Sequence, residues 1–265
     1  MEKDLIIEAA GNLIKLRTQL VSLENLPEHC RPRDEKEAYA IQDELHRQFT
    51  EHGFGSRIGY KIGCTTPVMQ AYMSIDHPCV GGIFEGRNHY SPASLDYKAF
   101  HAPGVECEIA VELSQILDAR GQPISREEAD GSIAALYPAI EVVDDRYKDI
   151  MALGTPTLIA DDFCQSAVVL GPKSKDTKGI DLETVTGQTF INDVEVGNGK
   201  GRDVLGHPLN ALIWLANHLA LRNRFLYPGE IIFLGSLVQC HWLKPNDTAH
   251  IKIAGLGSVT AKFPG

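Results

Sequence analysis

Two stretches of helical periodicity open the chain, and each places its apolar residues on one face. In the first, from about Asp4 to Leu23, leucine, isoleucine and alanine recur at spacings of three and four residues. The second runs from Asp34 to Gly53, and prolines separate the two. We therefore predict a helical N-terminal part over residues 1–55. We expect neither helix to carry a reactive group, and we expect His46 and His52 of the second helix to be exposed to solvent.

From Ser56 onward the pattern changes to short apolar or alternating runs separated by glycine and proline. Residues 74–84 are rich in turn formers and predict a connection rather than a strand. A hairpin is expected around Asn192-Asp193, and a helix over Pro208–Leu221. The predicted strands are Arg57–Gly63, Gly104–Leu113, Pro138–Asp144, Glu230–Leu237, Thr248–Ile253 and Ser258–Phe263. The pattern indicates an α+β protein whose residues 56–265 form a β-rich part.

The strand predicted over 104–113 carries an unusual set of acids. Its period-two alternation places Glu106, Glu108 and Glu112 on one face, and Glu141 lies alone inside the apolar strand that follows. Carboxylates that face a core are costly unless a cation or a donor compensates them, and hard oxygen ligands favour Mg²⁺, Ca²⁺ or Mn²⁺. The alternative is a solvated acidic face, with Glu141 paired to a nearby arginine such as Arg146.

Composition narrows the classes of function. The formal charge of −10 and the isoelectric point near 5.4 argue against a nucleic-acid partner. No run of apolar residues is long enough to span a membrane, and the acidic start does not resemble a signal peptide, so we expect a soluble, cytoplasmic protein. The six cysteines include no C-x-x-C pair, which favours reduced thiols over disulfides or a zinc site.

Several common catalytic motifs are absent. The chain has no G-x-G-x-x-G after a strand, no P-loop, no nucleophile elbow and no H-E-x-x-H. Nucleotide-cofactor chemistry and serine hydrolysis therefore lose most of their support, and metal-assisted chemistry remains.

Two further segments carry candidate chemistry. Lys61 lies between apolar neighbours in a strand flanked by glycines, where the alternative is a surface lysine on an edge strand. The connection over 74–84 contains Asp76, His77 and Cys79, and His77 precedes a proline and could simply fill a turn.

Together these segments resemble a known family. The residues that carry the resemblance are Gly59-Tyr60-Lys61-Ile62-Gly63, Gln70, Val105-Glu106-Cys107-Glu108-Ile109, Pro138 to Arg146, Pro228-Gly229-Glu230, Gly235-Ser236 and Gly257-Ser258-Val259. They are similar to the group of 2-keto-4-pentenoate hydratases and 4-oxalocrotonate decarboxylases in the fumarylacetoacetate hydrolase superfamily. The resemblance implies a mixed β-roll core of the fumarylacetoacetate hydrolase C-terminal-domain type, preceded by a helical N-terminal part.

The resemblance also implies a site and a ligand. Mg²⁺ or Mn²⁺ would be bound by Glu106, Glu108 and Glu141, with Glu112 a bystander. The substrate would be a small 2-oxo or 2-hydroxy-dienoic acid, and the protein would form homo-oligomers. The remaining candidates are Lys61, Asp76, His77 and Cys79 as catalytic residues, and Lys61, Gln70, Arg146, Asp162 and Ser236 as substrate-binding residues.

One departure from the family pattern bears on the reaction. Where the hydratases are expected to have Asp-x-Pro-Asp-x-Gly, this chain has Asp76-His77-Pro78-Cys79-Val80-Gly81. We expect a hydratase that adds water to a 2-hydroxy-2,4-dienoate to give a 4-hydroxy-2-oxo acid, with Asp76 or His77 replacing the missing acid. The alternatives are a decarboxylase of a 2-oxo-enedioate, an acylpyruvate hydrolase with His77 or His101 in an acid–base role, and a catalytically silent 2-oxo-acid-binding relative.

Overall fold

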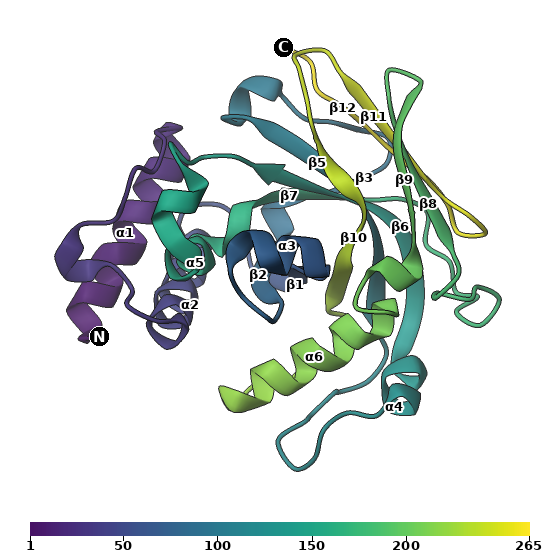
Figure 1. The fold of residues 1–265 in the computed structure, drawn as a ribbon, viewed down its shortest axis with the longest axis horizontal. Helices are drawn as coiled ribbons and strands as arrows, with labels where there is room; N and C mark the ends of the chain where they lie inside the picture. Colours follow the sequence, from purple (N-terminus) through teal and green to yellow (C-terminus); the bar gives the residue numbers. More distant parts are fainter.

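A computed structural model describes all 265 residues, and it places a group of helices beside two β-sheets (Figure 1). Helices α1 and α2 pack against each other, and α2 also packs on α5. The α-helices are α1 (Lys3–Gln19), α2 (Glu35–Glu51), α3 (Pro67–Met73), α4 (Arg126–Gly131), α5 (Ile150–Ala160) and α6 (Pro208–Leu221). None of them is long and apolar enough to cross a membrane.

The larger sheet has seven strands and carries the acidic strand near its centre. In spatial order its strands are β2 (Cys79–Phe84), β1 (Arg57–Gly63), β10 (Ile231–Trp242), β5 (Pro103–Leu113), β6 (Ile133–Asp144), β7 (Gln165–Leu170) and β3 (Asn88–Tyr90). Neighbours run antiparallel except β1 with β10 and β7 with β3. Most side chains of β5 and β6 are buried, on both faces of the sheet.

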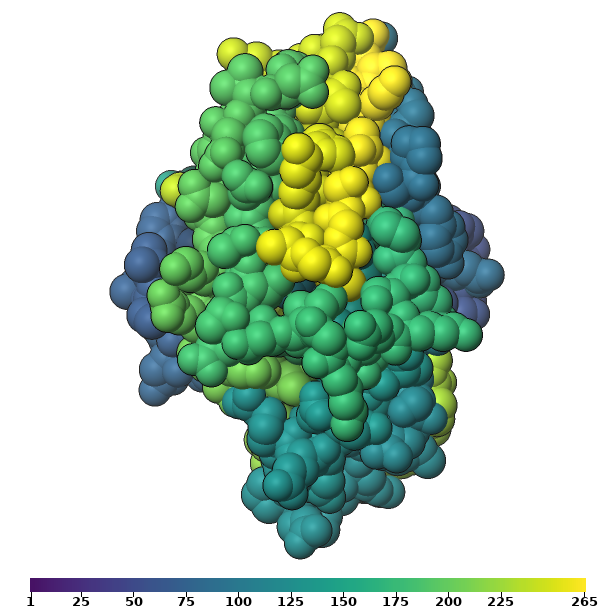
Figure 2. All heavy atoms as spheres, turned by 90° about the vertical axis from the view of Figure 1, so that its right-hand side faces the viewer, coloured from purple at the N-terminus to yellow at the C-terminus, as the bar shows by residue number.

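The smaller sheet packs on the larger one through β5, β6 and β10. In spatial order its five strands are β4 (Ala93–Ser94), β12 (Gly257–Lys262), β11 (Thr248–Ile253), β8 (Thr186–Ile191) and β9 (Val194–Lys200). Figure 2 shows the face remote from the N-terminal helices, where the yellow C-terminal strands lie between the green β8–β9 region and the blue segment that contains β4. The sequence and the structure agree on the mixed α+β fold.

Most predicted elements are present. The two N-terminal helices, the strand with Lys61, the acidic strand and the helix from Pro208 begin and end within a few residues of their predicted bounds. The expected hairpin also forms, and both of its turn residues, Asn192 and Asp193, take positive φ between β8 and β9. All six cysteines are free thiols. The division of the chain at residues 55 and 56 stays a prediction, since one hydrophobic core includes residues from both parts.

One prediction was wrong, and one helix was not predicted. The segment expected to be a connection contains strand β2, which pairs with β1 over its whole length. The sequence pattern did not show this strand because Gly81 and Gly82 have low β propensity, although close packing requires glycine at both positions. Helix α5 was missed because Gly154 and Pro156 interrupt its pattern, and Gly154 has non-helical backbone angles inside it.

A buried ion-pair group attaches the first helix to the β-rich part. Arg17 of α1 donates from Nε to Asp161 Oδ1 at 2.6 Å, and Arg146 donates from Nη2 to Asp161 Oδ2 at 3.0 Å. Tyr147 donates its hydroxyl to the same carboxylate at 2.9 Å. Burial alone would raise the pKa of Asp161, but Arg146 and Arg17 outweigh it and hold that pKa below its usual range. The ionised form of Asp161 is therefore favoured more strongly in the folded protein than in the unfolded chain.

We expect Asp161→Asn to lower the free energy of unfolding at pH 7 by about 3–5 kcal/mol, because two buried guanidinium groups lose their counter-ion. The depressed pKa means that the contribution of Asp161 is complete above the ordinary Asp value of about 3.9 and is lost as the pH falls from there through the folded-state value. Urea denaturation between pH 7 and pH 3 should show that the wild type has a larger free energy of unfolding than Asp161→Asn. This difference should be constant at first and should shrink below about pH 4. Exposed Asp76→Asn is the control, and a difference that persists undiminished to pH 3 would contradict this role.

Candidate active site

Three glutamates meet where β5 and β6 pair. Glu106 is directly opposite Glu141 in the antiparallel register, and Glu108 is two residues further along the same face of β5. One oxygen atom from each carboxylate lies within 4.8 Å of the other two. Glu108 and Glu141 are buried, whereas Glu106 is half-buried. The structure therefore brings together the three residues predicted as metal ligands.

Strand β10 fixes the orientation of Glu108. The backbone N–H of Gly235 donates to Glu108 Oε2 at 2.8 Å. Gly235 has φ of +109°, and a Cβ at this position would lie 2.3 Å from the hydroxyl oxygen of Thr65. Only glycine suits both the backbone conformation and the space, so a glycine at this irregular point of β10 allows the strand to present its N–H to Glu108.

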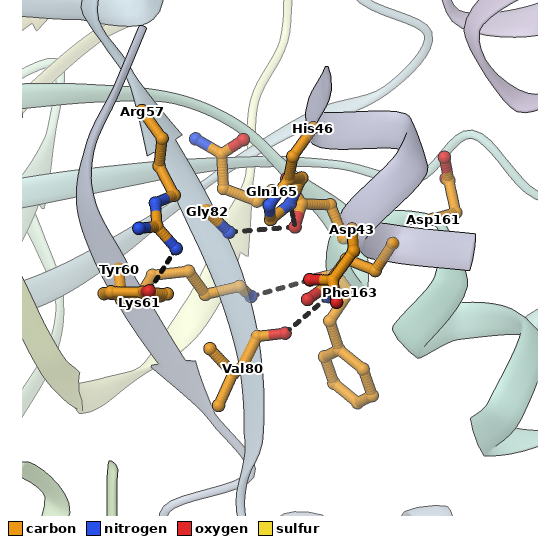
Figure 3. Close-up of polar contacts among 12 residues, drawn as sticks. Asp43, His46, Arg57, Tyr60, Lys61, Val80, Gly82, Asp161, Phe163 and Gln165 are labelled. Carbon is orange, nitrogen blue, oxygen red and sulfur yellow. Dashed lines mark hydrogen bonds and ion pairs between the residues drawn. The ribbon is translucent and has the colours of Figure 1, made fainter. Parts of the chain in front are cut away.

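Lys61 supplies the positive charge beside the carboxylates. It is buried on β1, and its Nζ lies 3.2 Å from Glu141 Oε1 and donates to the carbonyl oxygen of Phe163 at 2.6 Å (Figure 3). Burial would lower the pKa of Lys61, but Glu141 and then Glu106 outweigh it and raise that pKa above its usual value. The predicted alternative of a surface lysine on an edge strand is wrong, since β1 lies between β2 and β10.

Burial and neighbouring carboxylates raise the pKa values of Glu106 and Glu108. Burial, followed by the charge of Glu141, raises the pKa of Glu106 to about 7, with Lys61 acting in the opposite direction. Burial, then Glu141 and Glu106, raises the pKa of Glu108 well above its usual range. Two charges 4.8 Å apart repel by roughly 3 kcal/mol at an effective dielectric constant of about 20. One lysine does not neutralise three such groups.

A hard divalent cation fits this arrangement. Glu108 Oε1 and Glu141 Oε1 are buried and accept no hydrogen bond, although the latter lies near Lys61. Unsatisfied buried carboxylate oxygens are rare unless an ion or water compensates them. The donor set is entirely oxygen, which suits Mg²⁺, Mn²⁺ or Ca²⁺ and does not suit zinc.

Glu112 is separate from this cluster. Its carboxylate binds Lys173 Nζ at 2.6 Å and accepts the hydroxyl of Tyr137 at 2.5 Å. It lies on the same strand and the same face as Glu106 and Glu108, but at the far end of β5. Its partners neutralise it locally, as expected for a bystander.

The residues predicted to replace the missing acid lie in different surroundings. Asp76 is exposed, and His77 places its Nε2 3.1 Å from Glu35 of helix α2. Cys79 is fully buried at the start of β2 and shares a hydrogen bond with the thiol of Cys64. That bond first, and burial second, raise the pKa of Cys79 well above its usual value, so its thiol is neutral.

The predicted substrate-binding residues divide into two sets. Gln70 and Ser236 are half-buried on the α3 and β10 sides, where Gln70 donates to the carbonyl of Cys64 at 3.0 Å and Ser236 pairs with Glu108 across the strands. Arg146 and Asp162 are buried and engaged with protein groups. Arg146 is bound to Asp161 and to backbone carbonyls, so its guanidinium has an internal structural role.

Asp162 begins an unusual turn. Asp162, Phe163 and Cys164 have φ of +60°, +48° and +67°, a left-handed conformation that costs non-glycine residues roughly 1–2 kcal/mol each. Asp162 Oδ1 accepts from the backbone N–H of Gly82 and lies 2.8 Å from Nε2 of His46 on α2. The expectation that His46 is exposed was wrong, because only 11% of its side chain is accessible. Helical spacing could have found it, since it lies between Gln42 and Phe49 on the buried side of the helix.

Known proteins resemble this chain in sequence. The fumarylacetoacetate (FAA) hydrolase C-terminal family model matches residues 89–263. A 2-keto-4-pentenoate hydratase of Paraburkholderia phymatum is 31% identical over 265 residues, covering 99% of both chains. A 4-oxalocrotonate decarboxylase of Pseudomonas putida is 29% identical over 227 residues, covering 86% of this chain and 84% of the relative.

The fold is also that of a solved decarboxylase. The structure of 4-oxalocrotonate decarboxylase from Pseudomonas putida G7 with calcium and acetate superposes with a TM-score of 0.91 at 25% identity, covering 99% of this chain and 98% of the other. The complex of that protein with magnesium and adipate gives a TM-score of 0.93 at 24% identity with the same coverage.

The metal assignment predicts a clear contrast between glutamates on one strand. We expect Glu108→Gln to weaken Mn²⁺ binding by at least about 10-fold in isothermal titration calorimetry, because a ligand oxygen is replaced by an amide. Glu112→Gln, on the same face of β5, should bind Mn²⁺ as the wild type does.

A second readout needs no cation. In metal-free buffer the thermal midpoint of Glu108→Gln should not fall below that of the wild type, because a carboxyl group whose ionised form is disfavoured in the folded protein is replaced by a neutral amide of similar shape. Equal Mn²⁺ affinities for the two variants would show that the cation is not held by this cluster.

Proposed function

The chain belongs to the fumarylacetoacetate hydrolase family, and from this membership and the geometry of the site we propose that it is a divalent-metal-dependent lyase acting on a short 2-oxo or 2-hydroxy-dienoic acid. The reaction we favour adds water to a 2-hydroxy-2,4-dienoate to give a 4-hydroxy-2-oxo acid. The observation that carries the proposal is the cluster of Glu106, Glu108 and Glu141 oxygens, within 4.8 Å of one another and next to buried Lys61. The hydratase that is 31% identical over the whole chain supports the choice of reaction.

We assign Glu106, Glu108 and Glu141 to the cation, with Mg²⁺ or Mn²⁺ as the ion used. When bound, the ion would act as a Lewis acid toward the carboxylate and 2-oxo oxygens of the substrate and favour electron density at C3 and C5. The protein holds its three ligands on two paired strands, so their spacing is set by the sheet and not by a mobile loop.

Lys61 is the residue that we assign to substrate binding and proton transfer. Its ammonium group is held by Glu141 and by the carbonyl of Phe163, so it presents its remaining N–H donor in a fixed direction. A donor held in this way can neutralise a carboxylate or deliver a proton to carbon without reorganising. Half-buried Gln70 and Ser236 are candidates for orienting the substrate.

The balanced reaction has two stages. The dienol takes a proton at C5 and loses the proton of its 2-hydroxyl, which gives an α,β-unsaturated 2-oxo acid. Water then adds its hydroxyl at C4 and a proton at C3. The site has to position the carboxylate end firmly and exclude bulk water, and the burial of Lys61 and Glu141 at 2% and 1% exposure favours both requirements.

A decarboxylase is the second candidate, and Cys79 is the observation that favours it. A neutral, buried thiol stands where the hydratases are expected to have an acid, and His77 is engaged by Glu35 of helix α2. Loss of CO₂ from C6 of 2-oxohex-3-enedioate needs stabilisation of the same electron-rich dienolate and requires no activated water. The 29% identical decarboxylase supports this alternative.

We further propose that the protein works as a homo-oligomer in the cytoplasm. Its six free cysteines suit a reducing compartment. Exposed apolar side chains on β9 and β10, namely Val194, Val196 and Trp242, provide a candidate contact surface between copies.

The deciding experiment supplies Mg²⁺ with freshly prepared 2-hydroxypenta-2,4-dienoate or, separately, 2-oxohex-3-enedioate. We expect the dienoate absorbance to fall and the product mass to exceed that of the dienoate by one water. Lys61→Met should reduce kcat/KM by about 10²–10³-fold, because a preorganised donor is removed, while Glu112→Gln should leave it unchanged.

Other results would change the assignment. Loss of CO₂ from the dicarboxylate without hydration of the dienoate would identify a decarboxylase. If the protein binds the metal but turns over neither compound, an acylpyruvate is tested next. Its cleavage would identify a hydrolase, and no reaction would indicate a silent binding role.

A further inference from the structure

A histidine in the N-terminal helices reaches the surroundings of Lys61. His46 lies on α2, which lacks any of the residues assigned to the cation or the substrate. Its Nε2 lies 2.8 Å from Asp162 Oδ1, and the next residue, Phe163, supplies the carbonyl that accepts from Lys61 Nζ at 2.6 Å. Two hydrogen bonds and one peptide unit therefore connect the helix to the lysine.

The turn between them depends on outside support. Residues 162–164 are three successive non-glycine residues with positive φ, a conformation that persists only where neighbours impose it. The Asp162 carboxylate is fully buried and has two donors on Oδ1, the backbone N–H of Gly82 and His46 Nε2. An ionised carboxylate only accepts, so His46 Nε2 carries the proton in this pair.

The imidazole ring of His46 is fixed in place by its neighbours. It lies edge-on to Phe84, with ring centres 5.0 Å apart, and close to Phe49 on its own helix. A Cβ on Gly82 would lie 2.7 Å from His46 Cε1, so β2 is shaped to admit this ring. Figure 3 shows His46 and the N–H of Gly82 close together, and both lie 2.8 Å from Asp162 Oδ1.

The same strand also admits the lysine. A Cβ on Gly81 would lie 2.9 Å from both the carbonyl oxygen of Asp162 and Lys61 Cε. The ring of Phe163 lies 5.4 Å from Lys61 Nζ. Lys61 is thus packed between β2 and the turn, and its ammonium group has two anchors, Glu141 and the Phe163 carbonyl.

We propose that His46 is a positioning residue for Lys61: by holding the Asp162 carboxylate it keeps residues 162–164 in the conformation that directs the Phe163 carbonyl at the lysine. The inference rests on the proposed function in one respect, namely that Lys61 acts on the substrate. Asp162, predicted to bind substrate, takes the role of a link in this connection.

The test compares two polar residues of α2 that face the protein interior. His46→Phe keeps the aromatic packing on Phe84 but removes the donor, and His46→Gln restores a donor. The matched control is Gln42→Met, since Gln42 donates hydrogen bonds from the same helix to the carbonyls of Val80 and Ile159, both at 2.8 Å, rather than to Asp162. Circular dichroism would confirm that each variant is folded.

The first readout needs neither metal nor substrate. In metal-free protein, reductive methylation followed by mass spectrometry of the Lys61 peptide should be slow in the wild type and in Gln42→Met. It should be clearly faster in His46→Phe and return toward the wild-type rate in His46→Gln. Equal labelling in His46→Phe and Gln42→Met would overturn the proposal, whatever reaction the protein catalyses.

The second readout uses the substrate that the wild type turns over. His46→Phe should lower kcat about 10- to 100-fold, as expected for a misplaced group, with a smaller change in KM. In a Lys61→Met background the same substitution should cost nothing further, because its effect passes through the lysine. If the double variant instead lost activity by the product of the two single-variant losses, the proposal would be overturned. If Lys61→Met retains full activity, the assigned role of Lys61 fails, and the labelling rates still decide whether His46 positions it.

Discussion

The structure depends on the burial of several like charges in one place. Glu108 and Glu141 have almost no contact with water, and Glu106 is only half-buried beside them. In such surroundings an ionised carboxylate needs a donor or a cation. The protein provides one N–H from Gly235 and one ammonium group from Lys61, which leaves acidic charge in excess. A cation bound by these carboxylates would therefore stabilise the folded state and link its stability to the cation concentration.

The surrounding strands give this buried cluster a fixed geometry without relying on loops. Paired interior strands set the distance between Glu106 and Glu141, and β10 on the other side of β5 delivers the Gly235 N–H. Lys61 enters from β1 through the parallel pairing with β10. Four strands thus contribute to one site, and the backbone hydrogen bonds between them limit how far any of its groups can move.

Much of this could be predicted from the sequence, and the limits have physical causes. Period-two alternation revealed that Glu106 and Glu108 share a face, and the lone acid in an apolar strand revealed Glu141. Local pattern could not show β2, whose glycines are required by the ring of His46 and by Lys61 rather than by strand propensity. Helical spacing could show that His46 faces the interior, but it could not show the partner, because Asp162 is 116 residues away. The partner of Arg146, Asp161, is 15 residues away and follows α5, the helix that the sequence pattern did not predict.

The distribution of the site along the chain has an evolutionary consequence. The segment shared with the wider family, residues 89–263, contains all three glutamates, whereas Lys61, Cys79 and His46 precede it. The residues that we assign to the cation and the lysine that we assign to proton transfer thus lie in different stretches of the chain. Substitutions in the first 88 residues could redirect the chemistry while the cation site is inherited unchanged.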